Sequence, residues 1–184
     1  MTIKIQEDLR RRLLPDNRPG VFIDEETDTA TFLLYSLSGK MAGYIRYNPN
    51  ASKEKNNNYA GRYFIFAAYE SDKTHQIALW GVDTLHIGHS FVFVTEGVFD
   101  ANRLHLEGYP AIAILSNNSR AAPGFFGTLP CKTIAIMDND GPGQALGKLT
   151  DYAFTVPDPY HDLDDMPQDE VRQFVLKILG EIGR

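Results

Sequence analysis

The sequence predicts an α/β protein: a mainly parallel four-stranded sheet flanked by helices, preceded by a small, mostly β (α+β) lobe. Three uninterrupted apolar runs, FVFVT (91–95), AIAIL (111–115) and TIAIM (133–137), are typical of strands buried on both faces. A segment with helical spacing separates the first two runs and others follow the third, and strands that alternate with helices form parallel sheets. Upstream, strand candidates joined by a short turn predict the β lobe.

The N-terminal lobe is expected to span residues 1–88. It begins with a short basic helix at 6–14, which Pro15 stops. A turn at Ser38-Gly39-Lys40 joins its first two strands. Four strands are expected in this lobe: 29–35, 42–47, 62–69 and 76–80.

The second domain is expected to span residues 89–184. Its apolar runs give three strands, and a fourth strand is expected at 152–156. Between and after them, helices are expected at 98–106, 143–150 and 167–180. The first of these helices ends at Gly108, a residue that favours helix termination.

Composition excludes several classes of protein. With 184 residues and 43% hydrophobic residues, the chain has enough apolar side chains for a core. The single cysteine, Cys131, excludes a disulfide framework and an all-cysteine zinc site within the chain. No apolar run reaches the ~20 residues of a membrane span, and residues 1–14 are charged rather than signal-like.

The charge is unevenly distributed. The chain has a net charge of −6, which at first disfavours nucleic acid as a partner. Residues 1–80 carry 11 Lys and Arg against 10 Asp and Glu, whereas residues 81–184 carry 7 against 14. The excess acid is explained either by an ordinary acidic surface or by a cation site in the second half.

Acidic residues follow three of the predicted parallel strands. Glu96 comes directly after the first, Asp138 and Asp140 directly after the third, and Asp162 and Asp164 beyond the fourth. Each group alone is typical of a turn or a helix cap. Because carboxyl ends of parallel strands form one edge of a sheet, the groups together predict an oxygen-ligand site for Mg²⁺ or Mn²⁺ rather than zinc.

The segment FVFVTEGVFDANRLHLEGYPAIAIL, followed by IAIMDNDGPGQALGKL, resembles a TOPRIM domain, the fold shared by bacterial-type primases, topoisomerases and some nucleases. The resemblance covers about residues 90–166. EGVFDA and HDLDDM are similar to further primase motifs. The TOPRIM resemblance implies catalytic roles for Glu96, Asp138 and Asp140. It also implies a magnesium or manganese site formed by Glu96, Asp100, Asp138, Asp140, Asp162 and Asp164.

The N-terminal lobe resembles the lobe that precedes TOPRIM in bacterial and phage primases, through LLYSLSGKMAGYIRYN (33–48) and GRYFIF (61–66). This implies that Arg46 and Arg62 bind nucleotide phosphates or template. Asn117 and Asn118, which follow the second parallel strand, are expected either to line the same cleft or to form a turn. About half of a group of aromatic residues is expected in the core and the rest to be available for base stacking: Tyr44, Tyr47, Tyr59, Tyr63, Phe64 and Phe66.

The resemblance implies a cytoplasmic, metal-dependent nucleotidyltransferase that acts in DNA replication. Such an enzyme makes short RNA primers on a single-stranded DNA template from ribonucleoside triphosphates. Because the chain lacks both the cysteines of a zinc module and a GxxxxGK[ST] loop, a helicase or zinc-binding module is expected in trans. A phage or mobile-element origin fits the compact chain. Two alternatives stay open: a small TOPRIM nuclease, and a non-catalytic nucleic-acid or replisome-binding module.

Overall fold

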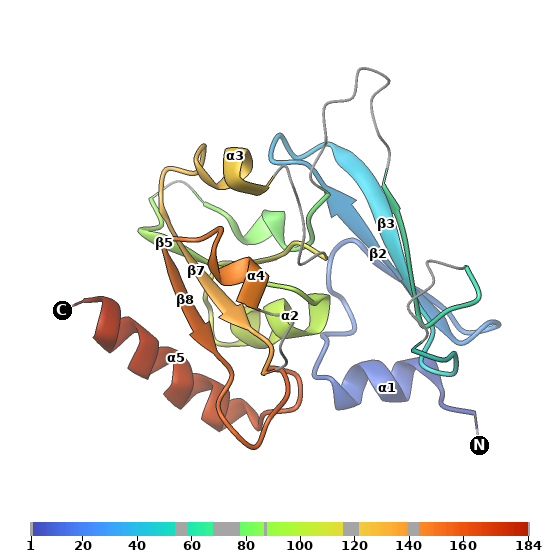
Figure 1. The fold of residues 1–184 in the computed structure, drawn as a ribbon. Helices are drawn as coiled ribbons and strands as arrows, with labels where there is room; N and C mark the ends of the chain where they lie inside the picture. Colours follow the sequence, from blue (N-terminus) through green and yellow to red (C-terminus); the bar gives the residue numbers. More distant parts are fainter. Residues whose placement is uncertain are drawn as a thin grey trace. The chain divides into compact units, whose positions relative to one another are not determined.

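The computed structural model describes residues 2–53, 59–67, 78–86, 88–115, 122–139 and 144–183. The chain divides into two compact units, Met1–Trp80 and Gly81–Arg184. Each unit contains its own four-stranded sheet (Figure 1). The first sheet is antiparallel and the second is parallel, which confirms the predicted α/β class with a preceding β lobe.

The N-terminal unit combines one helix with a meander of strands. Its elements are α1 (Ile5–Arg11), β1 (Val21–Asp24), β2 (Thr29–Tyr35), β3 (Met41–Tyr47) and β4 (Tyr63–Ala67). The strands lie in the order β1-β2-β3-β4, so each strand pairs with its neighbour in sequence. Such local antiparallel pairing needs only short connections.

Strand alternation separates a buried face of this sheet from a more exposed one. Phe32 and Leu34 of β2 and Ile45 and Tyr47 of β3 lie on the buried face. The ring of Phe32 packs edge-on against Trp80, with the centroids 6.2 Å apart. Burying these side chains supplies the main stabilisation of the unit, because apolar area removed from water contributes about 25 cal/mol per Å².

Asp8 of α1 is a buried acid that joins the helix to the sheet. Its side chain accepts hydrogen bonds from the Tyr47 hydroxyl (2.6 Å), from Arg11 Nη2 (2.5 Å) and from Arg12 Nε (3.1 Å). Burial raises the pKa of Asp8, but these hydrogen bonds and the charge of Arg12 outweigh burial and leave the pKa below its usual value of 3.8. Arg11, the last residue of α1, and Arg12, which follows it, thus help to hold α1 on the sheet.

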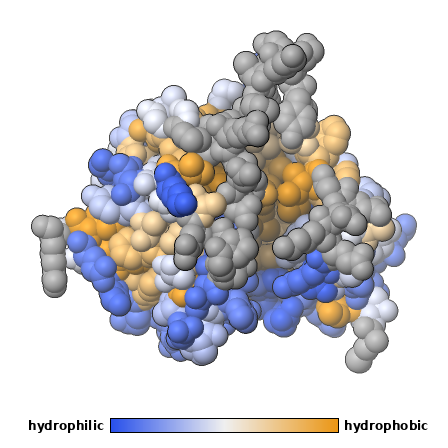
Figure 2. Space-filling model, viewed as in Figure 1, coloured by the Kyte–Doolittle hydropathy of each residue, from blue (hydrophilic) through white to orange (hydrophobic). Residues whose placement is uncertain are grey.

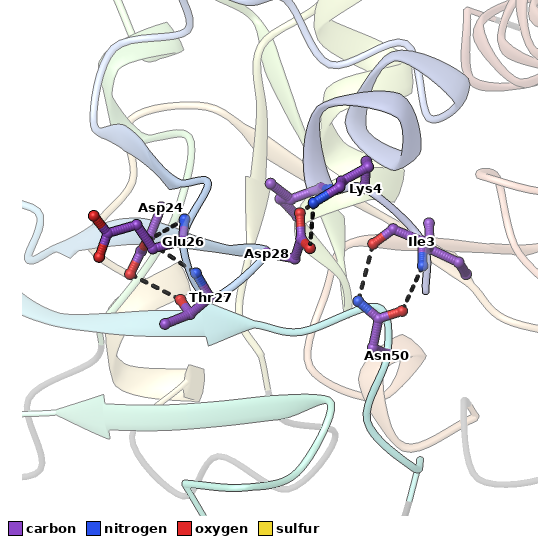
Figure 3. Close-up of polar contacts among 8 residues, drawn as sticks. Ile3, Lys4, Asp24, Glu26, Thr27, Asp28 and Asn50 are labelled. Carbon is purple, nitrogen blue, oxygen red and sulfur yellow. Dashed lines mark hydrogen bonds and ion pairs between the residues drawn. The ribbon is translucent and has the colours of Figure 1, made fainter. Parts of the chain in front are cut away.

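Polar side chains also fasten the N-terminal segment to the loops of the sheet (Figure 3). The Asn50 side chain bonds both backbone groups of Ile3, at 2.7 and 2.9 Å. Lys4 forms an ion pair with Asp28 (3.2 Å). In the turn between β1 and β2, the Asp24 carboxylate accepts the backbone N–H of Thr27 at 3.1 Å, which is the usual way an Asp stabilises a tight turn.

The sequence prediction missed β1, and one expected strand is reduced to a bridge. β1 reads VFID, which is too short to show a period-two pattern, and three of its four residues are exposed in the fold. In the expected strand at 76–80, residues 76 and 77 lie outside the described residues. Leu79 pairs with Tyr35 in an isolated antiparallel bridge.

The second unit alternates strands and helices. Its elements are a 3-10 turn η1 (Val82–Thr84), β5 (Phe91–Thr95), α2 (Val98–Leu106), β6 (Ala111–Ala113), α3 (Ala122–Phe126), β7 (Lys132–Met137), α4 (Gln144–Gly147), β8 (Tyr152–Thr155) and α5 (Gln168–Ile182). All strand pairs are parallel, in the order β6-β5-β7-β8. The apolar runs form β5, β6 and β7, as the sequence predicts, although β6 is shorter than the run that contains it.

Helices cover this parallel sheet. Helix α2 packs on β5 and β6 and touches α5, while α4 packs on β7 and β8. Gly108, with a φ of 79°, ends the turn that follows α2, in a conformation that favours glycine. Helix α3 was not predicted, because its APGFF sequence has the Pro and Gly composition of a turn. In the described part of the chain, no helix has the length and apolar character needed to span a membrane.

Candidate active site

The carboxyl edge of the parallel sheet collects the predicted acids. Glu96 follows β5 and Asp138 follows β7, and these two strands are direct neighbours. β8, the next strand, leads into the segment 156–166, which carries Asp162 and Asp164. The topology therefore brings together segments far apart in the sequence, since Asp100 and Asp164, 64 positions apart, are in direct contact. Asp140 lies outside the described residues, so its expected place beside Asp138 stays a prediction.

Asp100, in the first turn of α2, lies at the centre of this edge. It is only 7% exposed. The backbone N–H of Asp164 donates to Asp100 Oδ1 at 3.2 Å. The other oxygen, Oδ2, lies against Gly97, where a side-chain Cβ would collide with it. The glycine of the Glu96-Gly97 pair therefore leaves space for the Asp100 carboxylate.

The electrostatics of Asp100 show which other carboxylates are near it. Burial raises the pKa of Asp100 well above its usual value, and the negative charges of Asp162, Asp138 and Asp164 raise it further, in that order. Like charges act this strongly only at short range. Four of the six predicted metal ligands thus share one electrostatic environment, which a cation would stabilise.

The segment that carries Asp162 and Asp164 is attached to the end of β7. The backbone N–H of Asn139 donates to His161 O at 2.7 Å, and the Asn139 side-chain amide donates to Asp158 Oδ1 at 2.8 Å. Nearer the strand, the N–H of Val156 donates to Met137 O at 3.0 Å. Asn139, which lies between the expected ligands Asp138 and Asp140, therefore holds the segment of the third acidic group beside the second.

Arg103 is a part of this site that the sequence reading missed. The residue is buried, and its guanidinium donates to the backbone carbonyls of Leu163 (3.3 Å) and Met166. Burial lowers the pKa of Arg103, while the charges of Asp164, Asp100 and Asp162 act in the opposite direction. Arg103 follows Asp100 by three positions and so shares its face of α2, which is the one signal in the sequence.

The acids present are suited to a hard divalent cation. The donors around Asp100 are carboxylate oxygens, and such donors suit Mg²⁺ or Mn²⁺. Glu96 is half-buried, and its Oε1 atom is shielded from solvent. Across the described ranges, no three His, Cys, Asp or Glu side chains already converge at metal-ligand geometry. The expected ligand Asp140 is not among those ranges.

The residues predicted to bind nucleic acid are in different parts of the chain. Arg46 Nη1 donates to Tyr59 O at 2.9 Å, and Arg62 Nε donates to Ala51 O at 3.0 Å. Both arginines therefore support the loop between β3 and β4 in the N-terminal unit. Asn117 and Asn118 lie outside the described residues, so their predicted place in the cleft is untested. Phosphate contacts by any of these four residues stay a prediction.

Comparisons with known proteins give no match by sequence and clear matches by structure. No protein-family model matches the chain, and no curated protein sequence matches it. The chain is similar to the primase fragment of the bacteriophage T7 primase-helicase protein, with 12% identity and a TM-score of 0.62, over 85% of this chain and 64% of that chain.

Two further structures are similar over nearly the whole chain. The Aquifex aeolicus primase, comprising zinc-binding and RNA polymerase domains, is 18% identical with a TM-score of 0.61, over 94% of this chain and 46% of that chain. A DnaG primase catalytic domain bound to single-stranded DNA is 17% identical with a TM-score of 0.59, over 96% of this chain and 58% of that chain. The chain spans about half to two thirds of each of these three solved chains. The chain therefore has the fold of a primase catalytic core, which confirms the likeness to such cores drawn from the sequence.

Proposed function

We propose that the chain catalyses metal-dependent nucleotidyl transfer and, like a primase, synthesises short RNA primers on single-stranded DNA. The observation that carries this proposal is the gathering of Asp100, Asp138, Asp162 and Asp164 at the carboxyl edge of the parallel sheet. Ligands bind at this edge in open α/β sheets. The primase-core fold supports the choice of reaction.

Glu96, Asp138 and Asp140 are the proposed ligands of Mg²⁺ or Mn²⁺, with Asp100, Asp162 and Asp164 as additional ligands or supports. Two bound divalent ions would neutralise triphosphate charge and favour attack by a 3′-hydroxyl group. The chain itself orients the acids. Gly97 leaves room for Asp100, Asn139 fixes the segment that carries Asp162, and Arg103 holds the carbonyls on either side of Asp164 and Asp165.

The remaining assignments follow from this function. The substrates are a single-stranded DNA template and ribonucleoside triphosphates, and the work takes place in the cytoplasm. We assign the acid site to the domain formed by residues 89–184. In the lobe formed by residues 1–88, Arg46 and Arg62 are proposed to bind the template or nucleotide phosphates. Asn117 and Asn118 complete the proposed nucleotide-binding residues. A helicase or a zinc-binding module is the proposed protein partner.

The test is an incubation of the full chain with Mg²⁺ or Mn²⁺, single-stranded DNA and labelled ribonucleotides. New short oligoribonucleotides support the proposal. Asp138→Asn should abolish their synthesis, because it removes one proposed ligand, while the fold is kept because the repulsion acting on Asp100 decreases. The unfolding temperature and circular dichroism check the fold.

Asp165→Asn is the matched control. Asp165 is exposed and lies in the segment 156–166 with Asp162 and Asp164. It is not among the groups that raise the pKa of Asp100, so Asp165→Asn should retain activity. Shortened input DNA or RNA in place of new oligomers would identify a nuclease and refute primer synthesis. Full activity of Asp138→Asn would refute the ligand assignment.

A further inference from the structure

The peptide group that joins Leu163 to Asp164 is held from both sides by one face of α2. Its carbonyl oxygen accepts a hydrogen bond from Arg103 Nε at 3.3 Å, and its N–H donates to Asp100 Oδ1 at 3.2 Å. Asp100 and Arg103 are three positions apart in α2, so their side chains leave the helix on the same face. The position of Asp164 is therefore set by the contacts of its backbone with α2.

The same guanidinium also reaches the end of the segment. Arg103 Nη2 donates to Met166 O, and the N–H of Met166 donates to Leu163 O at 3.2 Å, so Arg103 bonds both ends of a tight turn. The side chains of Leu163 and Met166 are buried. Figure 2 shows hydrophilic side chains where the segment 156–166 reaches the surface, at the lower edge of the view. Residues 163–166 are thus anchored by two apolar side chains and by one planar group with several donors.

Arg103 places a positive charge among the acids. The residue is 5% exposed, so water and salt screen its charge only weakly. Burial lowers the pKa of Arg103, and the carboxylates of Asp164, Asp100 and Asp162 raise it. An arginine keeps its charge inside proteins, so the cation is present at neutral pH. It offsets part of the repulsion that these carboxylates exert on one another.

We propose that Arg103 is a resident counter-ion and a positioning residue of the acid site, and that its charge and its two carbonyl bonds hold Asp162 and Asp164 beside Asp100 before a divalent ion binds. A bound ion would then complete a charge balance that Arg103 has begun. The proposal deepens the proposed function, because the acids bind an ion only if that function holds. The holding of the segment by Arg103 does not depend on the reaction.

The test compares unfolding temperatures of the full chain in EDTA by differential scanning calorimetry. Arg103→Met, which keeps an unbranched side chain but removes the charge and the donors, should lower the unfolding temperature by roughly 10 °C. Arg103→Lys keeps the charge but lacks the planar arrangement of donors that reaches both carbonyls. It should therefore restore about half of this loss.

A second substitution separates the charge of Arg103 from its packing. Without Arg103, the repulsion between Asp164 and the other carboxylates is no longer offset. Asp164→Asn should therefore raise the unfolding temperature of Arg103→Met by roughly 3 °C more than it changes that of the wild type. Asp165→Asn is the matched control. Asp165 is exposed, lies in the same segment and is not among the charges that act on Arg103, so Asp165→Asn should have the same effect in both backgrounds.

The outcomes separate the two parts of the role of Arg103. Additive effects of Arg103→Met and Asp164→Asn would overturn the counter-ion role, and an unchanged unfolding temperature of Arg103→Met would overturn the positioning role. If Arg103→Met does not fold, a folded Arg103→Met/Asp164→Asn chain supports the proposal, and an unfolded one overturns it. Because EDTA removes divalent ions, these results are independent of whether primer synthesis is observed.

Discussion

At the scale of single residues, the chain is held by buried charges that have several partners each. Asp8 receives three charged or hydroxyl donors, and Arg103 donates to two carbonyls beside three carboxylates. Removing one partner of such a buried arrangement lowers the free energy of unfolding more than losing an exposed ion pair does, because the other charged group stays buried without a partner.

For Asp8, the pKa shift predicts how stability depends on pH. The folded-state pKa of Asp8 is below its ordinary value of 3.8, so its contribution is complete above that value and is lost as the pH falls through the folded-state pKa. Asp8→Asn should lower the free energy of unfolding at neutral pH by about 3 kcal/mol. Urea unfolding from pH 7 to pH 3 measures both effects.

Asp16→Asn provides the comparison for Asp8. Asp16 is exposed and lies 3.7 Å from Arg10, a surface ion pair that contributes less than about 1 kcal/mol. Its variant should keep the pH dependence of the wild type. If Asp8→Asn unfolds with the same acid dependence as the wild type, another carboxylate controls the acid lability of this unit.

At the scale of elements, the sequence determines the strands of the parallel sheet more completely than the site they support. FVFVT and TIAIM are recognisable because every residue is apolar or β-branched and all except Phe91 are buried, so local pattern and tertiary environment agree. The sequence does not predict β1, which is short and mostly exposed, or α3, which contains Pro and Gly. Both elements depend on contacts with neighbouring parts of the fold rather than on a local pattern. The acids of the site were predictable from their positions after strands.

The supporting residues of the site were not predictable in the same way. A lone Arg in a helix is usually a surface residue, and only the fold shows that Arg103 is buried under the segment 163–166. The bond from Tyr47 to Asp8 joins residues 39 positions apart. No local pattern encodes such a pair, because its partners meet only after the sheet has formed.

Close packing between β3 and β4 predicts the effect of a single methyl group. A Cβ at Gly43 would collide with the carbonyl oxygen of Phe66 and lie 2.8 Å from the Cα of Ala67. Backbone atoms cannot move aside as a flexible side chain can. Gly43→Ala should therefore lower the free energy of unfolding by about 2 kcal/mol, measured by chemical denaturation.

Gly180→Ala is the opposite case. A Cβ at Gly180 of α5 meets nothing within 4 Å, so the same substitution should stabilise that helix by about 1 kcal/mol through its better helix propensity. A neutral effect of Gly43→Ala would mean that β3 and β4 separate more easily than their register suggests.

At the scale of the whole molecule, the two units differ in charge. The N-terminal unit carries a small positive charge, whereas the second unit carries most of the acid, including four carboxylates in one environment. A divalent cation bound there stabilises only the state in which these carboxylates are gathered.

Mg²⁺ or Mn²⁺ should therefore raise the unfolding temperature of the second unit, by an amount that grows with the logarithm of concentration above the Kd. Differential scanning calorimetry at constant ionic strength measures this rise, with NaCl as the reference. EDTA should reverse it, and Asp138→Asn should reduce it. An equal rise with NaCl would show that screening, rather than site binding, is the cause.

The attachment of the segment 156–166 to the end of β7 has a consequence for the speed of ion capture. Because Asn139 already bonds His161 and Asp158 in the folded chain, Asp162 and Asp164 are pre-organised. The conformational entropy of this segment is lost when the chain folds and not when a ligand arrives. If Asp162 and Asp164 are ligands as proposed, we expect cation association to be limited by loss of the ion's own hydration water rather than by rearrangement of this segment.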